Sequence, residues 1–378
     1  MHLPESSAVD IGVLSRLFSD CTNSYKYLFF LSLLDAVSRR YDSGEAPLEV
    51  PTDELAVGML LHAWYPRVYF RLSFGLQDQI PGILDALALR APFAARFDWN
   101  GREKLKEHLQ LNLDAKAQRT LLRYVVSRLL RGFFTDLRGL PDHKVDGAIA
   151  TLARERFEQS RPLYRLDSTG ERAGVILHPH WVRYLRENFA IVSGWAAWEW
   201  CRYMVSRNRS VPAVSEKLFP PRERASLERQ RAYWLTYLSE GPVMCLYTGL
   251  PLDTRAFALD HYLPWKFVLH DQLWNLVPVS GVANSSKSDN LPSVRYDEAY
   301  TRLHVDALLA TRAKMKPNLW SKSVESYVSD LGLSFDLLRS GDEACLMSAM
   351  GTALSGTIGP LSGLARQLGF VAGWEYRA

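Results

Sequence analysis

The chain has 378 residues, of which 47% are hydrophobic and 23% are charged, and its formal net charge is +4. These values are ordinary for a soluble globular protein, and they leave room for two or three domains or for one catalytic module held in a larger scaffold. The weakly basic balance permits a polyanionic partner but does not by itself indicate a nucleic-acid-binding protein.

The cysteines and the apolar stretches argue against several classes of protein. Cys21, Cys201, Cys245 and Cys345 lie far apart and form no Cys-x-x-Cys pair, so we expect neither a structural zinc site nor a disulfide framework. The start MHLPESSAVD lacks the pattern of a signal peptide, and the longest mainly apolar stretch, 27–34, is shorter than the about 20 residues that span a bilayer. We therefore expect a cytoplasmic protein with no membrane insertion.

Helical patterns dominate the first 240 residues, which we interpret as a scaffold or regulatory region. A buried helix is predicted over 21–40, where the run is apolar nearly all round, and a second helix over 52–65. An amphipathic helix is predicted over 115–138, because apolar residues recur there at helical spacing and Gly139 marks its end. The opposite face carries Arg123, Arg128, Arg131 and Arg138. For these arginines we favour a solvated polar face over a phosphate-contacting stripe.

The following segments predict a hairpin and two more helices. Residues 163–179 indicate a short hairpin around a Ser-Thr-Gly turn, and an aromatic helix follows over 181–207. A proline-containing linker then leads to a helix over 221–238, which has proline in its first turn and stops at Gly241.

The sequence changes character after Gly241. VMCLYTGLPL and FALDHYLPW are short β-like runs, and WNLVPVSGVANSSKSDNLP passes from a strand-like run into a polar segment, before helical spacing returns over 297–314. We therefore predict an α+β, mainly helical fold. It has a compact ββα module over 241–295, between a helical block over 1–240 and a helical C-terminal region over 296–378.

The module carries polar residues that suit the hydrolysis of a phosphodiester bond. This reaction needs an activated water, a cation that stabilises charge on the phosphate oxygens, and help for the leaving alkoxide. Histidine is the natural base near neutral pH, and Mg²⁺ prefers hard oxygen ligands such as a carboxylate and an amide carbonyl. The chain supplies these groups as Asp260 and His261, then Asn275, then Asn284 and Lys287.

In this order and spacing, residues 245–292 resemble the HNH endonuclease motif, also called the ββα-metal motif. The resemblance implies that His261 is the general base that activates water, and that Asp260 and Asn284 are ligands of one Mg²⁺ or Mn²⁺ ion. It implies that Asn275 braces the loop between the two strands. Asn284 stands where other members have histidine, which is the HNN variant of the motif. Many members also bind a structural zinc through two cysteine pairs, whereas this module has one cysteine.

Each of these residues has another interpretation when it is taken alone. An Asp-His pair is most often a surface dipeptide, and residues 284–287 read as a capped helix start. Asn275 lies within the apolar run WNLVPV, so it needs hydrogen-bond partners, and we interpret its role as largely structural. Lys287 is expected either to contact a phosphate of the substrate or to be solvated. The joint order and spacing of the residues favour the nuclease motif.

The order of Asp260 and His261 raises a geometric question. Adjacent residues of a regular strand point to opposite faces, so the two side chains cannot both reach one ion from such a strand. We expect one of two arrangements. In the first, Asp260 holds the metal while His261 faces the path of the water; in the second, the strand bends as it approaches Pro264.

The resemblance implies a metal-dependent endonuclease that hydrolyses DNA, with Asp260, His261 and Asn284 in catalytic roles. One ββα site cuts one strand per encounter, so a monomer is expected to nick duplex DNA and only a suitably arranged homodimer to make a double-strand break. Two alternatives stay open. One is a DNA-binding or regulatory module whose HNH fold is inactive, and the other is an RNA-directed or toxin-type nuclease.

Two segments outside the module show a wider similarity. Residues 22–35 and 217–234 are similar to segments of bacterial HNH-domain proteins of about this length, some of them associated with phage defence. This similarity implies an antiviral defence effector that cuts invading DNA, such as the HNH effector of type II Zorya systems. Defence-system proteins are then expected as further partners.

Overall fold

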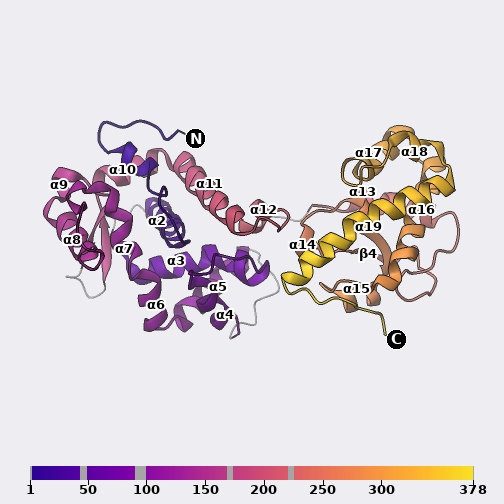
Figure 1. The fold of residues 1–378 in the computed structure, drawn as a ribbon, viewed down its shortest axis with the longest axis horizontal. Coiled ribbons are helices and arrows are strands. Elements are labelled where there is room, and N and C mark those ends of the chain that lie inside the picture. Colours follow the sequence, from indigo (N-terminus) through magenta and orange to yellow (C-terminus); the bar gives the residue numbers. More distant parts are fainter. Residues whose placement is uncertain (1, 43–48, 90–98, 168–172, 220–224, 378) are drawn as a thin grey trace. The chain divides into compact units, whose positions relative to one another are not determined.

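The computed structural model describes residues 2–42, 49–89, 99–167, 173–219 and 225–377. The chain forms two compact units, the first made of 1–209 with 214–222 and the second made of 210–213 with 223–378 (Figure 1). Helices dominate both units, and each unit has a small antiparallel sheet. The mainly helical α+β class predicted from the sequence is confirmed.

The first unit contains, in chain order, α1 (Ile11–Ser15), α2 (Tyr25–Asp42), β1 (Glu49–Pro51), α3 (Thr52–Trp64), the π-helix η1 (Tyr65–Tyr69), α4 (Ile80–Ala88), α5 (Trp99–Asn112), α6 (Ala115–Leu122), α7 (Val125–Arg128), the 3-10 helices η2 (Leu129–Phe133) and η3 (Thr135–Leu137), α8 (Asp142–Glu155), α9 (Phe157–Ser160), β2 (Tyr164–Asp167), β3 (Gly174–Leu177), α10 (Pro179–Glu187), α11 (Phe189–Arg207) and α12 (Val214–Leu218).

The core of the first unit forms around α2. Phe29, Phe30 and Leu33 have no exposed surface, and α2 packs against α3 and α11. The buried helix predicted over 21–40 is therefore confirmed as α2. Burying each such side chain stabilises the fold by roughly 1.5–3 kcal/mol. The predicted hairpin is also confirmed, because β2 pairs with β3 in the sheet order β1-β3-β2. Its Ser-Thr-Gly turn lies outside the described residues.

The predicted continuous helix over 115–138 is wrong. The structure divides this segment into α6, α7, η2 and η3, and the first break comes at Tyr124, with φ −117°. Val125, Val126, Leu129 and Leu130 are all buried, and the breaks let the second half of the segment turn these side chains into the core. The arginines are not equivalent either. Arg128 is held by ion pairs to two aspartates of α8 at 3.0 Å, so it is not a free phosphate contact.

The second unit contains, in chain order, α13 (Glu228–Leu238), β4 (Phe257–His261), α14 (Trp265–Val268), the 3-10 helix η4 (Leu273–Asn275), β5 (Leu276–Ser280), α15 (Gly281–Lys287), the 3-10 helix η5 (Val294–Tyr296), α16 (Asp297–Lys314), α17 (Pro317–Ser329), α18 (Phe335–Ser340) and α19 (Glu343–Gln367).

A two-stranded hairpin lies at the centre of the second unit. Strands β4 and β5 pair antiparallel, with Phe257 opposite Ser280 and His261 opposite Leu276, and α15 packs against both strands. Helix α13 also packs against β5 and α16, through a core that includes Tyr233 and Trp234. The compact unit therefore includes α13, which the sequence analysis had assigned to the preceding helical block.

Helix α19 is the long yellow helix of Figure 1, and it packs against α16. Its 25 residues are long and apolar enough to cross a membrane by length and composition, a property that core helices of soluble proteins share. One of its faces buries Leu346, Met350 and Leu354 in the core of the second unit.

Candidate active site

Strand β4 places Asp260 and His261 in separate environments. The strand pairs regularly through both residues, with Asp260 opposite Val277 and His261 opposite Leu276, so it does not bend between them. Asp260 is 3% exposed, whereas the side chain of His261 is 15% exposed. Because neighbouring residues of a strand point to opposite faces, the two side chains meet different partners. The bend that the second expected arrangement requires is therefore absent from β4, and the two side chains occupy separate positions.

Asp260 lies in a buried ion pair. The ammonium of Lys287 is 3.1 Å from each of its carboxylate oxygens, and the hydroxyl of Tyr247 donates to Oδ2 at 2.7 Å. Burial raises the pKa of Asp260, while Lys287 and the Tyr247 hydroxyl act in the opposite direction. A buried carboxylate is costly unless it is paired and hydrogen-bonded, and these two donors supply both conditions.

Lys287 also ties helix α15 to strand β4. Its ammonium donates to the backbone carbonyl of His261 at 2.7 Å, and the whole residue is 0% exposed. The sequence predicts that this lysine contacts a phosphate or is solvated, but the structure buries its ammonium against Asp260 and the carbonyl of His261. The last turn of α15 packs on β4, so the ammonium points into the domain, where Asp260 and the carbonyl oxygen accept its protons.

His261 is oriented by a carboxylate that the sequence analysis did not select. Its Nε2 lies 2.8 Å from Oδ1 of Asp271. An ionised carboxylate only accepts hydrogen bonds, so Nε2 carries the proton of this contact, and in the neutral imidazole the lone pair is then on Nδ1. The only sequence signal for Asp271 is an acidic residue ten positions after the histidine in the same module. The loop between them has no periodicity that would have predicted the contact.

Asn275 links the residues that follow β4 to the residue that precedes β5. It is 0% exposed, its Oδ1 accepts from the backbone N–H of Leu263 at 2.8 Å, and its Nδ2 donates to the carbonyl of Leu263 at 3.0 Å. Its own carbonyl accepts from the N–H of Tyr262 at 2.8 Å. These contacts fix the chain just after His261, so they hold the backbone that aims the imidazole.

The HNH endonuclease family profile matches residues 245–293, which include the whole β4–β5–α15 arrangement. Residues 245–293 form an HNH endonuclease domain. The match supports a nuclease that hydrolyses a nucleic-acid substrate, and HNH endonucleases generally depend on a divalent metal. No curated protein and no solved structure matches the chain.

Asn284 lies on α15 of the HNH domain, one turn before Lys287 and therefore on the same side of the helix. Ser280 caps this helix by accepting from the N–H of Ala283 at 3.2 Å, which explains why the helix starts directly after β5. Asn284 is half-buried, and within the described part of the chain its side-chain amide has no hydrogen-bond partner. The amide is therefore available to water or to a ligand.

The oxygens of the HNH domain fit a divalent ion that retains water. Asp260 and Asn284 together offer a carboxylate and an amide oxygen, which are hard ligands of the kind that Mg²⁺ takes. Among the described residues there is no group of three or more His, Cys, Asp or Glu side chains that could hold a metal. Lys287 already neutralises Asp260, so an ion bound there would share the carboxylate with an ammonium group.

Elements outside the family match support the HNH domain. The C-terminal segment returns to the domain, where Trp374 donates from its backbone N–H to the carbonyl of Leu291 at 3.0 Å and packs its ring on Tyr247, with the centroids 5.1 Å apart. Tyr247 in turn holds Asp260, so this tail packs directly behind the buried ion pair.

Proposed function

We propose that the chain is a Mg²⁺- or Mn²⁺-dependent DNA endonuclease in which His261 activates the attacking water. The contact between His261 and Asp271, inside the HNH domain, carries this proposal. With its Nε2 proton directed to a carboxylate, the imidazole takes a proton from water through Nδ1. The carboxylate of Asp271 then stabilises the imidazolium that forms, and it also holds the ring in one orientation.

The other residues of the site would bind the metal ion or hold its ligands and the base in position. Asp260 and Asn284 would hold the metal ion, which when bound supplies positive charge to the phosphate oxygens and the leaving alkoxide. Asn275 keeps the backbone after His261 in place through its two hydrogen bonds to Leu263. Lys287 keeps the carboxylate of Asp260 ionised in a buried position.

We expect one cut per encounter. The HNH domain presents a single His261–Asp271 pair, so a monomer would nick one strand of duplex DNA, and a homodimer would be needed for a break in both strands. The nicked circle is therefore the expected first product from supercoiled plasmid.

The test is cleavage of supercoiled plasmid by the full chain. We expect open circles with Mg²⁺ or Mn²⁺ and none with EDTA or with His261→Ala. The matched control is His143→Ala, because His143 is an exposed histidine of α8 in the first unit. Cleavage that survives both EDTA and His261→Ala would overturn the assignment. Parallel reactions with single-stranded DNA and with RNA separate a DNA nuclease from an RNA-directed or toxin-type nuclease.

One observation favours a second candidate, a DNA-binding or regulatory module in which the HNH fold is silent. Lys287 already balances the charge of Asp260, as expected of a site that has no metal to bind. Salt-dependent binding of intact duplex, with no cleavage in any divalent metal, would support this candidate over the nuclease.

We also propose that residues 1–240 form a scaffold or regulatory region of an antiviral defence effector, with 241–295 as its nuclease and 296–378 as a helical C-terminal region. The support is the similarity of segments 22–35 and 217–234 to segments of bacterial HNH-domain proteins, some of them associated with phage defence. Bacteria that express the chain should plate phage less efficiently than bacteria that express His261→Ala. Equal plating would remove the defence role and leave the nuclease assignment standing.

A further inference from the structure

A polar cavity lies directly behind the His261–Asp271 pair. Its volume is about 350 Å³, and it is enclosed by α13, α17 and the loop of residues 271–273 that follows α14. The loop is shared with the candidate active site, because the carboxylate of Asp271 binds His261 while its backbone carbonyl accepts from Gln230 of α13 at 2.9 Å. The cavity is therefore one residue away from the catalytic base.

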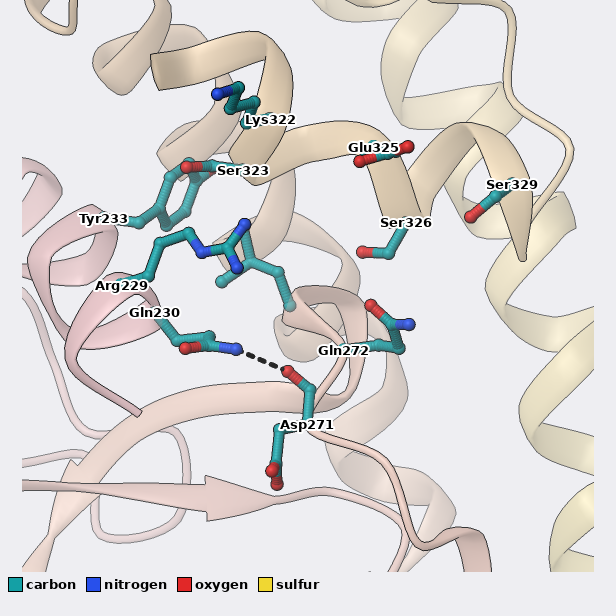
Figure 2. Close-up of a pocket in the computed structure, with 11 residues that line it drawn as sticks. Arg229, Gln230, Tyr233, Asp271, Gln272, Lys322, Ser323, Glu325, Ser326 and Ser329 are labelled. Carbon is teal, nitrogen blue, oxygen red and sulfur yellow. Dashed lines mark hydrogen bonds between the residues drawn. The ribbon is translucent and has the colours of Figure 1, made fainter. Parts of the chain in front are cut away.

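Three of the donor side chains that line this cavity, those of Arg229, Lys322 and Ser326, have no hydrogen-bond partner among the described residues. Figure 2 shows the guanidinium of Arg229 extending into the middle of the cavity, with the hydroxyl of Ser326 and the amide of Gln272 directed toward it. Ser326 is 5% exposed and its Oγ has no hydrogen-bond partner. Among the described residues, Arg229 and the rim residue Lys322 make neither an ion pair nor a side-chain hydrogen bond. A buried hydroxyl left unpaired costs free energy, so a ligand that accepts hydrogen bonds is indicated.

The charge of the cavity is positive where the ligand would lie. Two acidic residues contribute to its lining, Asp271 and Glu325. In Figure 2 the carboxylate of Asp271 points away from the cavity, and it is already the acceptor for His261. Glu325 is exposed, as are Arg229 and Lys322, so solvent screens all three charges. The arginine at the centre therefore has no opposing buried charge.

We propose that this cavity binds a backbone phosphate of the nucleic-acid strand, next to the scissile phosphate that the water activated by His261 attacks. This inference rests on the proposed function for the identity of the strand. The planar guanidinium of Arg229 binds two phosphate oxygens at once, Ser326 donates to one of them, and Lys322 adds charge at the rim. A phosphate held here fixes the register of the strand relative to the base without reading its sequence.

The test measures binding apart from cleavage. The full chain is titrated, in EDTA, into a short fluorescein-labelled DNA duplex at a series of salt concentrations, and anisotropy gives the Kd at each. Arg229→Gln should weaken binding by roughly 10- to 100-fold, the equivalent of one charged hydrogen-bonded contact, and should reduce the slope of log Kd against log salt by about one. Ser326→Ala should weaken binding less and leave the slope unchanged.

Two variants control for charge and folding. Lys316→Gln removes a positive charge from an exposed position at the start of the same helix, α17, outside the cavity, and it should leave the slope unchanged. Arg229→Lys keeps the charge but loses the two-oxygen geometry, so it should restore the slope while binding stays weaker than in the wild type. Glu325→Gln should tighten binding.

The possible outcomes distinguish a failure of the phosphate site from a failure of the proposed nuclease function. An Arg229→Gln variant that binds as Lys316→Gln does would overturn the phosphate site, even if the chain cuts plasmid. If the slope of log Kd against log salt falls only in the Arg229→Gln variant and the chain cuts no nucleic acid, the phosphate site is supported and the nuclease is rejected. A chain that binds neither DNA nor RNA at any salt concentration would reject both.

Discussion

The buried ion pair between Asp260 and Lys287 allows a quantitative test of the structure. Lys287 is 0% exposed and Asp260 is 3% exposed, and the ammonium makes three contacts, at 3.1 Å to each carboxylate oxygen and at 2.7 Å to a backbone carbonyl. The substitution Lys287→Met keeps most of the side-chain volume but leaves the carboxylate buried without its cation. Breaking a buried pair in this way costs about 3–5 kcal/mol.

Amide hydrogen exchange of the full chain, read by mass spectrometry on peptides from β4 and β5, measures this cost where it arises. A loss of about 3–5 kcal/mol corresponds to faster exchange by roughly two to four powers of ten. The exposed Lys316→Met is the matched control and should change exchange little. The double variant Asp260→Asn with Lys287→Met should recover protection, because no lone charge remains and the Asn still accepts from Tyr247. If Lys287→Met exchanges as Lys316→Met does, the buried pair does not stabilise the hairpin and the reasoning fails.

Three further predictions concern single residues. Asp271→Asn should lower kcat by roughly 10²-fold or more with KM unchanged, since an amide does not stabilise an imidazolium, and an unaltered kcat in the plasmid assay would refute the orienting role. Asn275→Ala should leave the N–H and the carbonyl of Leu263 unpaired, which costs about 1–3 kcal/mol of unfolding free energy for each group. The shift of the urea unfolding midpoint, compared with an Asn290→Ala control, measures this loss. Burial lowers the pKa of His304 from 6.5 to about 3, so the unfolded chain binds the proton first as pH falls. The contribution of His304 to stability is thus complete above about pH 6.5 and falls by roughly 1.4 kcal/mol per pH unit between there and about pH 3. The substitution His304→Gln should remove this slope from a pH series of unfolding curves.

The sequence alone located several elements whose deciding interactions are local. The predicted helix over 297–314 coincides with α16, and the helix over 52–65 differs from α3 by one residue, because helical periodicity and end signals lie within each segment. The helix predicted over 181–207 is divided into α10 and α11, and the one predicted over 221–238 is helical from Glu228 within the described residues. The HNH domain was also identified from the order of its residues, since Asp260, His261, Asn275 and Asn284 fall within one short stretch. Asn275 could be given a structural role before its partners were known, because a polar side chain in an apolar run needs hydrogen bonds.

The tertiary structure decided what depends on contacts between distant segments. The breaks in 115–138 follow from packing around the core, and α13 joins the second unit because its aromatic face meets β5 and α16. Loop geometry brings Asp271 to His261, and the last turn of α15 buries Lys287 against Asp260. Charge and spacing left this lysine equally suited to a phosphate or to solvent, and they did not indicate a buried pair. Only the packing of α15 on β4, which removes its ammonium from water, selects the pair.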